Sequence, residues 1–278
     1  MEYFMYNGKL QEGSAAIASA NNRGLRFGDG LFETIKCNKG QPELGDEHFA
    51  RLWKGLQVLQ FNIPKHFSPD TLEEDIRKLL KKNDHLGVAR VRVTVFRGDG
   101  GLYDAASHIP NYLVQSWALP EDTGNWNSNG LVLGFYTDVK KSCDILSNLK
   151  HNNFLPYVMA ALEAKKQKWN DAIVLNTNDR LCDTTIANIF FIKDEIIYTP
   201  ALKEGCIAGV MRKNIIDKLN SKYRLVEGEF DIDDLLAADE VFLSNSIYNI
   251  RWVQSIGEKK YGNTLSQKIY AAVFPTNS

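Results

Sequence analysis

The chain has 278 residues and a formal net charge of -1, with 44% hydrophobic and 24% charged residues. This composition is that of a globular protein and excludes wholesale disorder and collagen-like repeats. Because 33 basic residues are balanced by 34 acidic ones, the charge predicts neither a nucleic-acid surface nor an anionic-membrane surface. The apolar runs are far shorter than the ~20 residues of a membrane helix, and the start lacks a secretory signal, so we expect a cytoplasmic protein.

The first part of the chain is predicted to alternate short strands with helices. Strict alternation of apolar and polar residues in 89–96 is typical of a half-buried strand. Apolar residues at helical spacing predict two helices, with Asp46 as the N-cap of one and Ser68 opening the other. The expected elements are strands 3–6, 31–37, 89–96 and 112–119 and helices 46–60 and 68–82.

The most polar and turn-rich stretch is 120–130, which we interpret as an interdomain linker. It separates a small N-terminal domain, 1–119, from a larger C-terminal domain, 131–278. Both halves mix strands with helices, which predicts a two-domain α+β or mixed α/β fold. The elements expected after the linker are strands 131–136, 172–176, 186–192, 196–199 and 240–244 and helices 153–169 and 210–219.

The cysteines lie far apart, at positions 37, 143, 182 and 206. They form no CxxC pair, so we expect no zinc site and no other metal site. Their spacing is that of reduced thiols in a cytosolic protein.

Lys150 and Asp183 lie at junctions between predicted elements, where they could carry chemistry. A lysine amine becomes nucleophilic only when burial or a second cation lowers its pKa. Asp183 comes just before an apolar strand, where a buried carboxylate would pair with a cation such as a protonated ring nitrogen. Taken singly, each residue is more often an ordinary one: a solvated lysine in the first case and a solvated carboxylate at a turn or strand edge in the second.

Three further segments carry groups that suit a phosphate. Small residues in Gly205–Arg212 precede a helix, whose first N–H groups bind anions; Arg51 offers a guanidinium fork; and Ser244-Asn245-Ser246 offers hydroxyls and an amide. Each segment also has an ordinary interpretation, as a loop before a helix, a surface arginine and a turn. A lysine for an imine, an acid for a ring nitrogen and phosphate-binding groups are together the parts that hold pyridoxal 5′-phosphate.

The order of these motifs resembles the class IV, fold-type IV pyridoxal-phosphate enzymes, which include branched-chain aminotransferases, D-amino acid aminotransferases and aminodeoxychorismate lyases. The resemblance implies a small N-terminal α/β domain, a larger C-terminal pseudo-barrel domain that binds the cofactor, and a homodimer. The segments that carry it are Arg23–Ile35, His48–Leu52, Lys150 with Asn153, Asp183 with Asn188–Phe190, Tyr198–Pro200 and Gly209–Arg212.

The resemblance also implies roles for single residues. Lys150 would bind the cofactor and then, once the substrate amine has formed the external aldimine, abstract the Cα proton. Asp183 would face the pyridine nitrogen, although the family usually has Glu there, so we expect either a shifted ring or a bridging water. The phosphate would be bound by Arg51, the Val210 and Met211 amides, Asn245 and Ser246.

The segment Arg97–Tyr103 looks like the glycine-rich loop of the aminodeoxychorismate lyases, which makes Arg97, Gly100 and Tyr103 candidate substrate-loop residues. The Arg-x-His clamp of the D-amino acid enzymes and the Arg-Pro of the branched-chain enzymes are both missing. The resemblance therefore favours a 4-amino-4-deoxychorismate lyase, which releases pyruvate and p-aminobenzoate in folate biosynthesis. The alternatives are a branched-chain or D-amino acid aminotransferase that uses 2-oxoglutarate, and a catalytically silent binding protein on the same fold.

Overall fold

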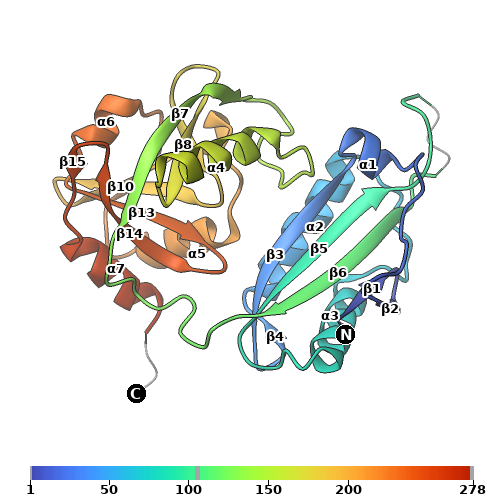
Figure 1. Cartoon of the computed structure of the whole chain (residues 1–278). Coiled ribbons are helices and arrows are strands. Elements are labelled where there is room, and N and C mark those ends of the chain that lie inside the picture. Colours follow the sequence, from blue (N-terminus) through green and yellow to red (C-terminus); the bar gives the residue numbers. More distant parts are fainter. Residues whose placement is uncertain (1, 104–106, 276–278) are drawn as a thin grey trace. The chain divides into compact units, whose positions relative to one another are not determined.

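A computed structural model describes residues 2–103 and 107–275, and they fall into two compact units. The N-terminal unit consists of Met1–Thr123 and Leu149–Asn153, and the C-terminal unit of Gly124–Asn148 and Phe154–Ser278 (Figure 1). The boundary at Thr123 falls inside the polar stretch 120–130. The return of Leu149–Asn153 to the first unit is a feature that the sequence did not predict.

The N-terminal unit is built on a six-stranded antiparallel sheet with the strand order β2-β1-β6-β5-β3-β4. Side chains alternate between the two faces of a strand, so Val91, Val93 and Val95 all point to one face, where they are fully buried with apolar residues of α2 and α3. The elements are β1 (Tyr3–Tyr6), β2 (Lys9–Glu12), α1 (Arg23–Phe27), β3 (Gly30–Asn38), β4 (Gln41–Pro42), α2 (Gly45–Val58), α3 (Pro69–Lys82), β5 (Ala89–Arg97) and β6 (Pro110–Ala118).

The two predicted helices of this unit are present, but one of their caps differs. Ser68 caps α3 as expected, and its hydroxyl accepts the N–H of Thr71. The N-cap of α2 is Leu44 instead of Asp46, which lies in the first turn. A carboxylate in that turn still favours the helix, because it faces the positive end of the helix dipole.

The C-terminal unit contains a nine-stranded sheet in which six strands close on themselves. The pairings run β7–β8–β9–β10–β13–β14 and back to β7, so the predicted pseudo-barrel is confirmed. The elements are β7 (Leu131–Lys141), α4 (Leu155–Gln167), β8 (Asp171–Asn176), β9 (Leu181–Thr184), β10 (Asn188–Lys193), β11 (Ile196–Pro200), a 3-10 turn (Leu202–Glu204), α5 (Val210–Leu219), β12 (Leu225–Gly228), α6 (Ile232–Leu236), β13 (Glu240–Asn245), β14 (Asn249–Ile256), β15 (Lys259–Lys260) and α7 (Thr264–Val273).

The ring of strands closes at a single residue pair, Asn188 opposite Asp183. Asp183 therefore lies within a short strand, and the predicted strand 186–192 begins later, at Asn188. A tight turn separates the two strands, since the N–H of Thr184 donates to the carbonyl of Ala187 at 2.9 Å. Ile186, the apolar residue that suggested an earlier start, is 56% exposed in this turn.

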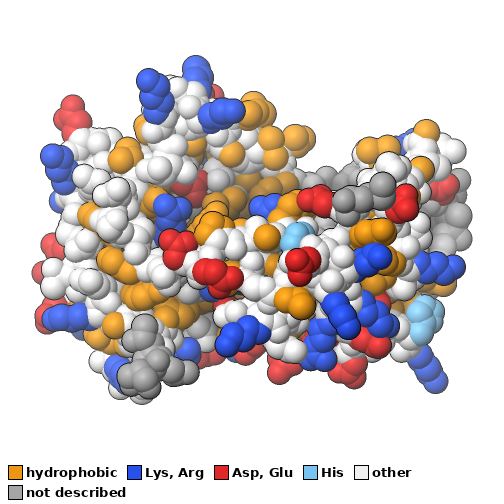
Figure 2. Space-filling view, turned by 60° about the horizontal axis from the view of Figure 1, so that its bottom comes forward, with side chains coloured by type: hydrophobic (Ala, Val, Ile, Leu, Met, Phe, Trp, Pro, Cys, Tyr) orange, Lys and Arg blue, Asp and Glu red, His pale blue; other side chains and the backbone are white. Residues whose placement is uncertain are grey.

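Acidic and basic side chains are interspersed over the face of the molecule shown in Figure 2. In the part of the chain that the structure describes, every helix is too short or too polar to cross a bilayer. No cluster of at least three His, Cys, Asp or Glu side chains suited to a metal ion occurs among the same residues.

Candidate active site

Lys150 extends the sheet of the N-terminal unit. The N–H of Phe32 donates to the carbonyl of Lys150 at 2.8 Å, and the N–H of Asn152 donates to the carbonyl of Gly30 at 2.9 Å. Paired residues of neighbouring strands point to the same face, which puts the Lys150 side chain beside Phe32, on the face opposite the helices. Its Nζ lies 4.6 Å from the centroid of the Phe32 ring, and the guanidinium carbon of Arg92 lies 3.8 Å from the same centroid. The half-buried amine thus shares an aromatic ring with a second cation.

Arg51 is held by a buried carboxylate. Its Nε and a terminal nitrogen donate to the two oxygens of Glu33 at 2.7 and 2.6 Å, and Nδ1 of His48 contacts the same carboxylate at 2.8 Å. Glu33 is 1% exposed, and its strand packs on the helix that carries Arg51 and His48. The interpretation of Arg51 as a surface arginine is therefore wrong, because its side chain is only 15% exposed.

Glu33 is ionised in this cluster. Burial opposes the charge, but Arg51 and His48 outweigh burial and lower the pKa of Glu33 from 4.5 to about 2. Because the folded-state pKa lies below the unfolded one, the cluster stabilises the fold above about pH 4.5, and this contribution is lost as the pH falls toward 2. The fork of Arg51 consequently keeps a fixed orientation throughout the neutral range.

Asp183 is buried at the closure of the pseudo-barrel and is 2% exposed. Its Oδ2 accepts hydrogen bonds from the hydroxyl of Tyr157 and the N–H of Ile207, both at 2.8 Å, and its Oδ1 accepts one from Nδ2 of Asn188 at 2.9 Å. The interpretation of Asp183 as a solvated carboxylate is therefore wrong. Burial raises the pKa of Asp183, while Lys141 and the three hydrogen bonds oppose that rise.

Backbone N–H groups suited to binding an anion lie at the start of α5, in the same unit. We call this helix start, formed by Gly209, Val210 and Met211, the anion cradle. The N-cap is Gly209, no side chain caps the helix, and the first N–H groups, those of Val210 and Met211, have no intrahelical acceptor. A Cβ on Gly209 would lie 1.9 Å from Oδ1 of Asn188, so a side chain there would close the cradle. Ser244 lies opposite Asn188 on the neighbouring strand, and its buried hydroxyl has no partner among the described atoms.

The other residues of the predicted phosphate cup, Asn245 and Ser246, form a turn. Oδ1 of Asn245 accepts the N–H groups of Ile247 and Tyr248 at 3.0 and 2.8 Å. Ser246 is half-buried in that turn. The turn interpretation of this segment is thus confirmed for Asn245, whereas Ser244 is the member with an unsatisfied hydroxyl.

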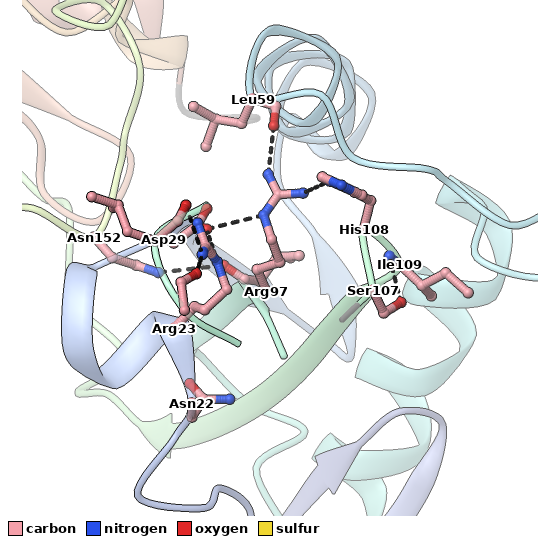
Figure 3. A network of polar contacts seen from close by, with 12 residues as sticks. Asn22, Arg23, Asp29, Leu59, Arg97, Ser107, His108, Ile109 and Asn152 are labelled. Atoms are coloured by element: carbon pink, nitrogen blue, oxygen red, sulfur yellow. Dashed lines mark hydrogen bonds and ion pairs between the residues drawn. The ribbon is translucent and has the colours of Figure 1, made fainter. Parts of the chain in front are cut away.

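Arg97 lies inside the N-terminal unit, 5% exposed, rather than in a solvent-facing loop. Its guanidinium donates to Asp29 at 3.0 Å, to Nδ1 of His108 at 2.7 Å and to the carbonyl of Leu59 at 2.6 Å (Figure 3). Asp29 also accepts Nε of Arg23 at 2.9 Å. Arg23 in turn donates to the carbonyls of Gly101 and, at 3.3 Å, Leu102, so the network supports the glycine-rich loop from beneath.

The two other candidate residues of that loop differ in their surroundings: Tyr103 is exposed, and Gly100 makes a backbone hydrogen bond. Tyr103 is 97% exposed. Gly100 adopts a φ of 147°, a conformation that residues with a side chain rarely adopt, and its N–H donates to the carbonyl of Asn21 at 3.2 Å. The loop is therefore fixed at its glycines and offers the Tyr103 side chain to solvent.

A family model described as amino-transferase class IV matches residues 30–256. The chain belongs to this family. The aminodeoxychorismate lyase of Vibrio harveyi is 32% identical over 238 residues, which cover 84% of this chain and 86% of that protein. The D-alanine aminotransferase of Listeria innocua is 26% identical over 266 residues, covering 88% and 84%. The crystal structure of 4-amino-4-deoxychorismate lyase from Pseudomonas aeruginosa superposes with a TM-score of 0.81 at 27% identity, covering 96% of each chain.

The class IV assignment and the fold predicted from the sequence are thus confirmed. The sequence does not point to Glu33 and Tyr157, which contact predicted site residues of this class IV chain, or to Lys141, whose charge acts on Asp183. Glu33 lies within the motif Arg23–Ile35, which identified the family but not the partner of Arg51. Tyr157 and Lys141 gave no signal, because burial brings them to Asp183 from different elements.

Proposed function

We propose that the chain is a pyridoxal 5′-phosphate enzyme in which Lys150 is the catalytic lysine. The observation that carries this proposal is the coupling of the buried acid to the anion cradle through Asn188. Nδ2 of Asn188 donates both to Asp183 and, at 2.8 Å, to the carbonyl of Ile207, and Gly209 packs against the same side chain. A carboxylate for a ring nitrogen and N–H groups for a phosphate are therefore built into one unit.

The segment of the C-terminal unit that precedes Lys150 in the chain is hydrogen-bonded to the loop before α5. Asn148, two residues earlier, donates to the carbonyls of Leu202 and Cys206 at 2.8 and 2.6 Å, and its own carbonyl accepts the N–H of Ala208 at 3.1 Å. These hydrogen bonds fix the last residue of the C-terminal unit before the chain enters Leu149–Asn153, the segment that carries Lys150.

Each residue of the proposed site would then have its own role. When bound, the cofactor withdraws electron density from the substrate Cα and so makes its proton acidic. Lys150 would take that proton and return it at the next step. Asp183 would hold a proton on the ring nitrogen, and the phosphate would be bound by Arg51, the Val210 and Met211 amides and the segment 244–246, including Asn245 and Ser246.

We propose lyase chemistry on 4-amino-4-deoxychorismate, giving p-aminobenzoate and pyruvate. The glycine-rich loop 97–103 supports this reaction, and the higher identity to a lyase than to an aminotransferase, 32% against 26%, points the same way. Within this proposal Gly100 and Tyr103 belong to the substrate loop, whereas Arg97 supports that loop from the interior. The likeness to a D-alanine aminotransferase makes transamination with 2-oxoglutarate the second candidate.

Product analysis separates the two reactions. Purified protein loaded with pyridoxal phosphate is incubated with aminodeoxychorismate in one series and with amino acids plus 2-oxoglutarate in another. We expect p-aminobenzoate to accumulate in the first series. Glutamate in the second series without p-aminobenzoate in the first would assign transamination instead. A protein that binds the cofactor and forms neither product would contradict both reactions and identify a silent binding protein.

We further propose a homodimer whose interface includes an apolar face of α4. Tyr157, Ala160 and Ala164 on the inner face of α4 are buried. Four side chains at helical spacing on the other face are 43–71% exposed: Leu155, Val158, Met159 and Leu162. A continuous apolar stripe exposed on the surface of a helix is typical of a protein interface.

Introducing charge on this face is expected to dissociate the dimer. The variant Leu155→Glu/Leu162→Glu places two carboxylates in an interface that excludes water, and light scattering after size exclusion should then report the monomer mass. Leu86→Glu is the matched control, because Leu86 is 46% exposed but lies in the N-terminal unit, away from any such stripe. A monomeric wild-type protein, or a double variant that remains dimeric, would refute the assignment of this face.

A further inference from the structure

A buried lysine and the candidate acid both contact Tyr157. Lys141, the last residue of β7, is 5% exposed. Its Nζ donates to the carbonyl of Ser147 at 3.1 Å and lies 4.9 Å from the centroid of the Tyr157 ring. Lysine is rarely buried unless a negative charge or several acceptors compensate it. One carbonyl and one aromatic ring are a small set for an ammonium group, which directs attention to the carboxylate that Tyr157 binds.

That carboxylate is Asp183, and its own hydrogen-bond donors are all neutral. Tyr157 and the N–H of Ile207 occupy both acceptor positions of Oδ2, and Asn188 occupies one of the two positions of Oδ1. The charge that acts on Asp183 is the ammonium of Lys141, which favours its ionised form. Among the described residues Asn188 donates to Oδ1, which leaves one acceptor position for a further donor.

The remaining titratable groups around Asp183 are neutral at physiological pH. Burial raises the pKa of Tyr157 well above 10, with the charge of Asp183 adding to the effect, so its hydroxyl stays a donor. Burial likewise raises the pKa of the Cys182 and Cys206 thiols. Asp183 of β9 is therefore the acid of this cluster, and Lys141 of β7 is its basic group.

We propose that Lys141 is the counter-ion that keeps Asp183 ionised, and that Tyr157 fixes Oδ2 so that Oδ1 is presented to the ring nitrogen of the cofactor. This inference rests on the proposed function for the identity of the donor, but not for the pairing of the two charges. Lys141 and Tyr157 act through Asp183 and are positioning residues. An aspartate has one methylene less than the usual glutamate, so its oxygens need a fixed orientation to meet a donor.

The charge pairing is tested on the apoprotein by NMR. Protein labelled at Asp ¹³Cγ and Lys ¹⁵Nζ is titrated, and the Asp183 signal is assigned by its absence from Asp183→Asn. In the wild type we expect a carboxylate at Asp183 and an ammonium at Lys141 at neutral pH. In Lys141→Met the titration midpoint of Asp183 should rise by about one pH unit or more, a tenfold or greater gain in proton affinity.

Lys140→Met is the matched control, because Lys140 is the preceding residue of the same strand and pairs with Asp179 at the surface. We expect it to leave the Asp183 midpoint unchanged. Equal midpoints in the two methionine variants would overturn the proposal. A neutral Lys141 in the wild type would do the same, and that measurement needs no variant to fold.

The affinity for pyridoxal phosphate is a second measurement, and it distinguishes a failure of this inference from a failure of the proposed function. Tyr157→Phe removes one hydrogen-bond donor to Oδ2 of Asp183. We expect this variant to bind pyridoxal phosphate several-fold more weakly, while the interaction between Lys141 and Asp183 is retained. Unchanged affinity would refute the role of Tyr157. If the wild type bound no pyridoxal phosphate, the proposed function would fail, while the NMR titration would still decide whether Lys141 and Asp183 form the pair.

Discussion

Replacing Lys150 by alanine is expected to abolish the absorption band of lysine-linked pyridoxal and to lower turnover by about 10²–10⁴-fold. The amine of Lys150 is the group that would bind the aldehyde and carry the Cα proton, and alanine supplies neither function. The acid and the anion cradle of the C-terminal unit remain intact in this variant. We therefore expect Lys150→Ala still to bind pyridoxal phosphate, but with the spectrum of the free aldehyde.

Borohydride reduction followed by peptide mass spectrometry identifies the lysine that is covalently bound to the cofactor. In the wild type the cofactor mass should appear on the peptide that contains Lys150, and in Lys150→Ala on none. Lys193→Ala is the control, since Lys193 is exposed at the end of β10 and belongs to no part of the proposed site. Reduction that labels another lysine in the wild type, or a Lys150→Ala variant with full activity, would refute the assignment.

The periodic elements of this fold are encoded locally and were therefore predictable. Strand β5 is an example, because its valines are buried on one face and its intervening polar residues lie on the opposite face, as the alternation predicts. Helix α3 carries both its serine cap and its apolar stripe in contiguous sequence. In such elements the local pattern and the tertiary environment agree, and the boundaries fall within one or two residues.

The short strand that carries Asp183 was not predicted. A four-residue strand is too brief to show a period, and it follows the polar turn at 177–180, so the local pattern predicts a turn that leads to a later strand. Its burial depends on closure of the pseudo-barrel against Asn188, a contact between residues of separate strands. Lys141 escaped for the same reason, since nothing in the sequence distinguishes a lysine at a buried strand end from a solvated one.

Arg97 shows how a motif predicts a segment correctly and a side chain's role less well. The glycine-rich loop follows β5 as the motif requires, but the arginine that begins it points inward (Figure 3). Three acceptors and the ring of Phe61, 4.2 Å from the guanidinium carbon, surround the side chain. This environment predicts that Arg97 acts on substrate binding through the loop.

Arg97→Met is accordingly expected to destabilise the N-terminal unit by about 3 kcal/mol, because the carbonyl of Leu59 and one side of Asp29 lose a charged donor. Thermal unfolding of the apoprotein measures this loss. Arg90→Met is the matched control on the same strand, and we expect it to change stability by less than about 1 kcal/mol, since Arg90 is exposed over Trp117.

The effect of Arg97→Met on catalysis follows from the chain of contacts through Asp29 and Arg23 to the loop. Assayed well below its unfolding temperature, the variant should raise KM for the amino substrate about tenfold, equivalent to about 1.4 kcal/mol, and retain the cofactor band. Arg23→Met removes the last link of the same chain and should raise KM to a similar extent with a smaller loss of stability. If Arg97→Met instead abolished turnover while Arg23→Met had no effect, Arg97 would contact the substrate directly, and the interior network would be incidental to catalysis.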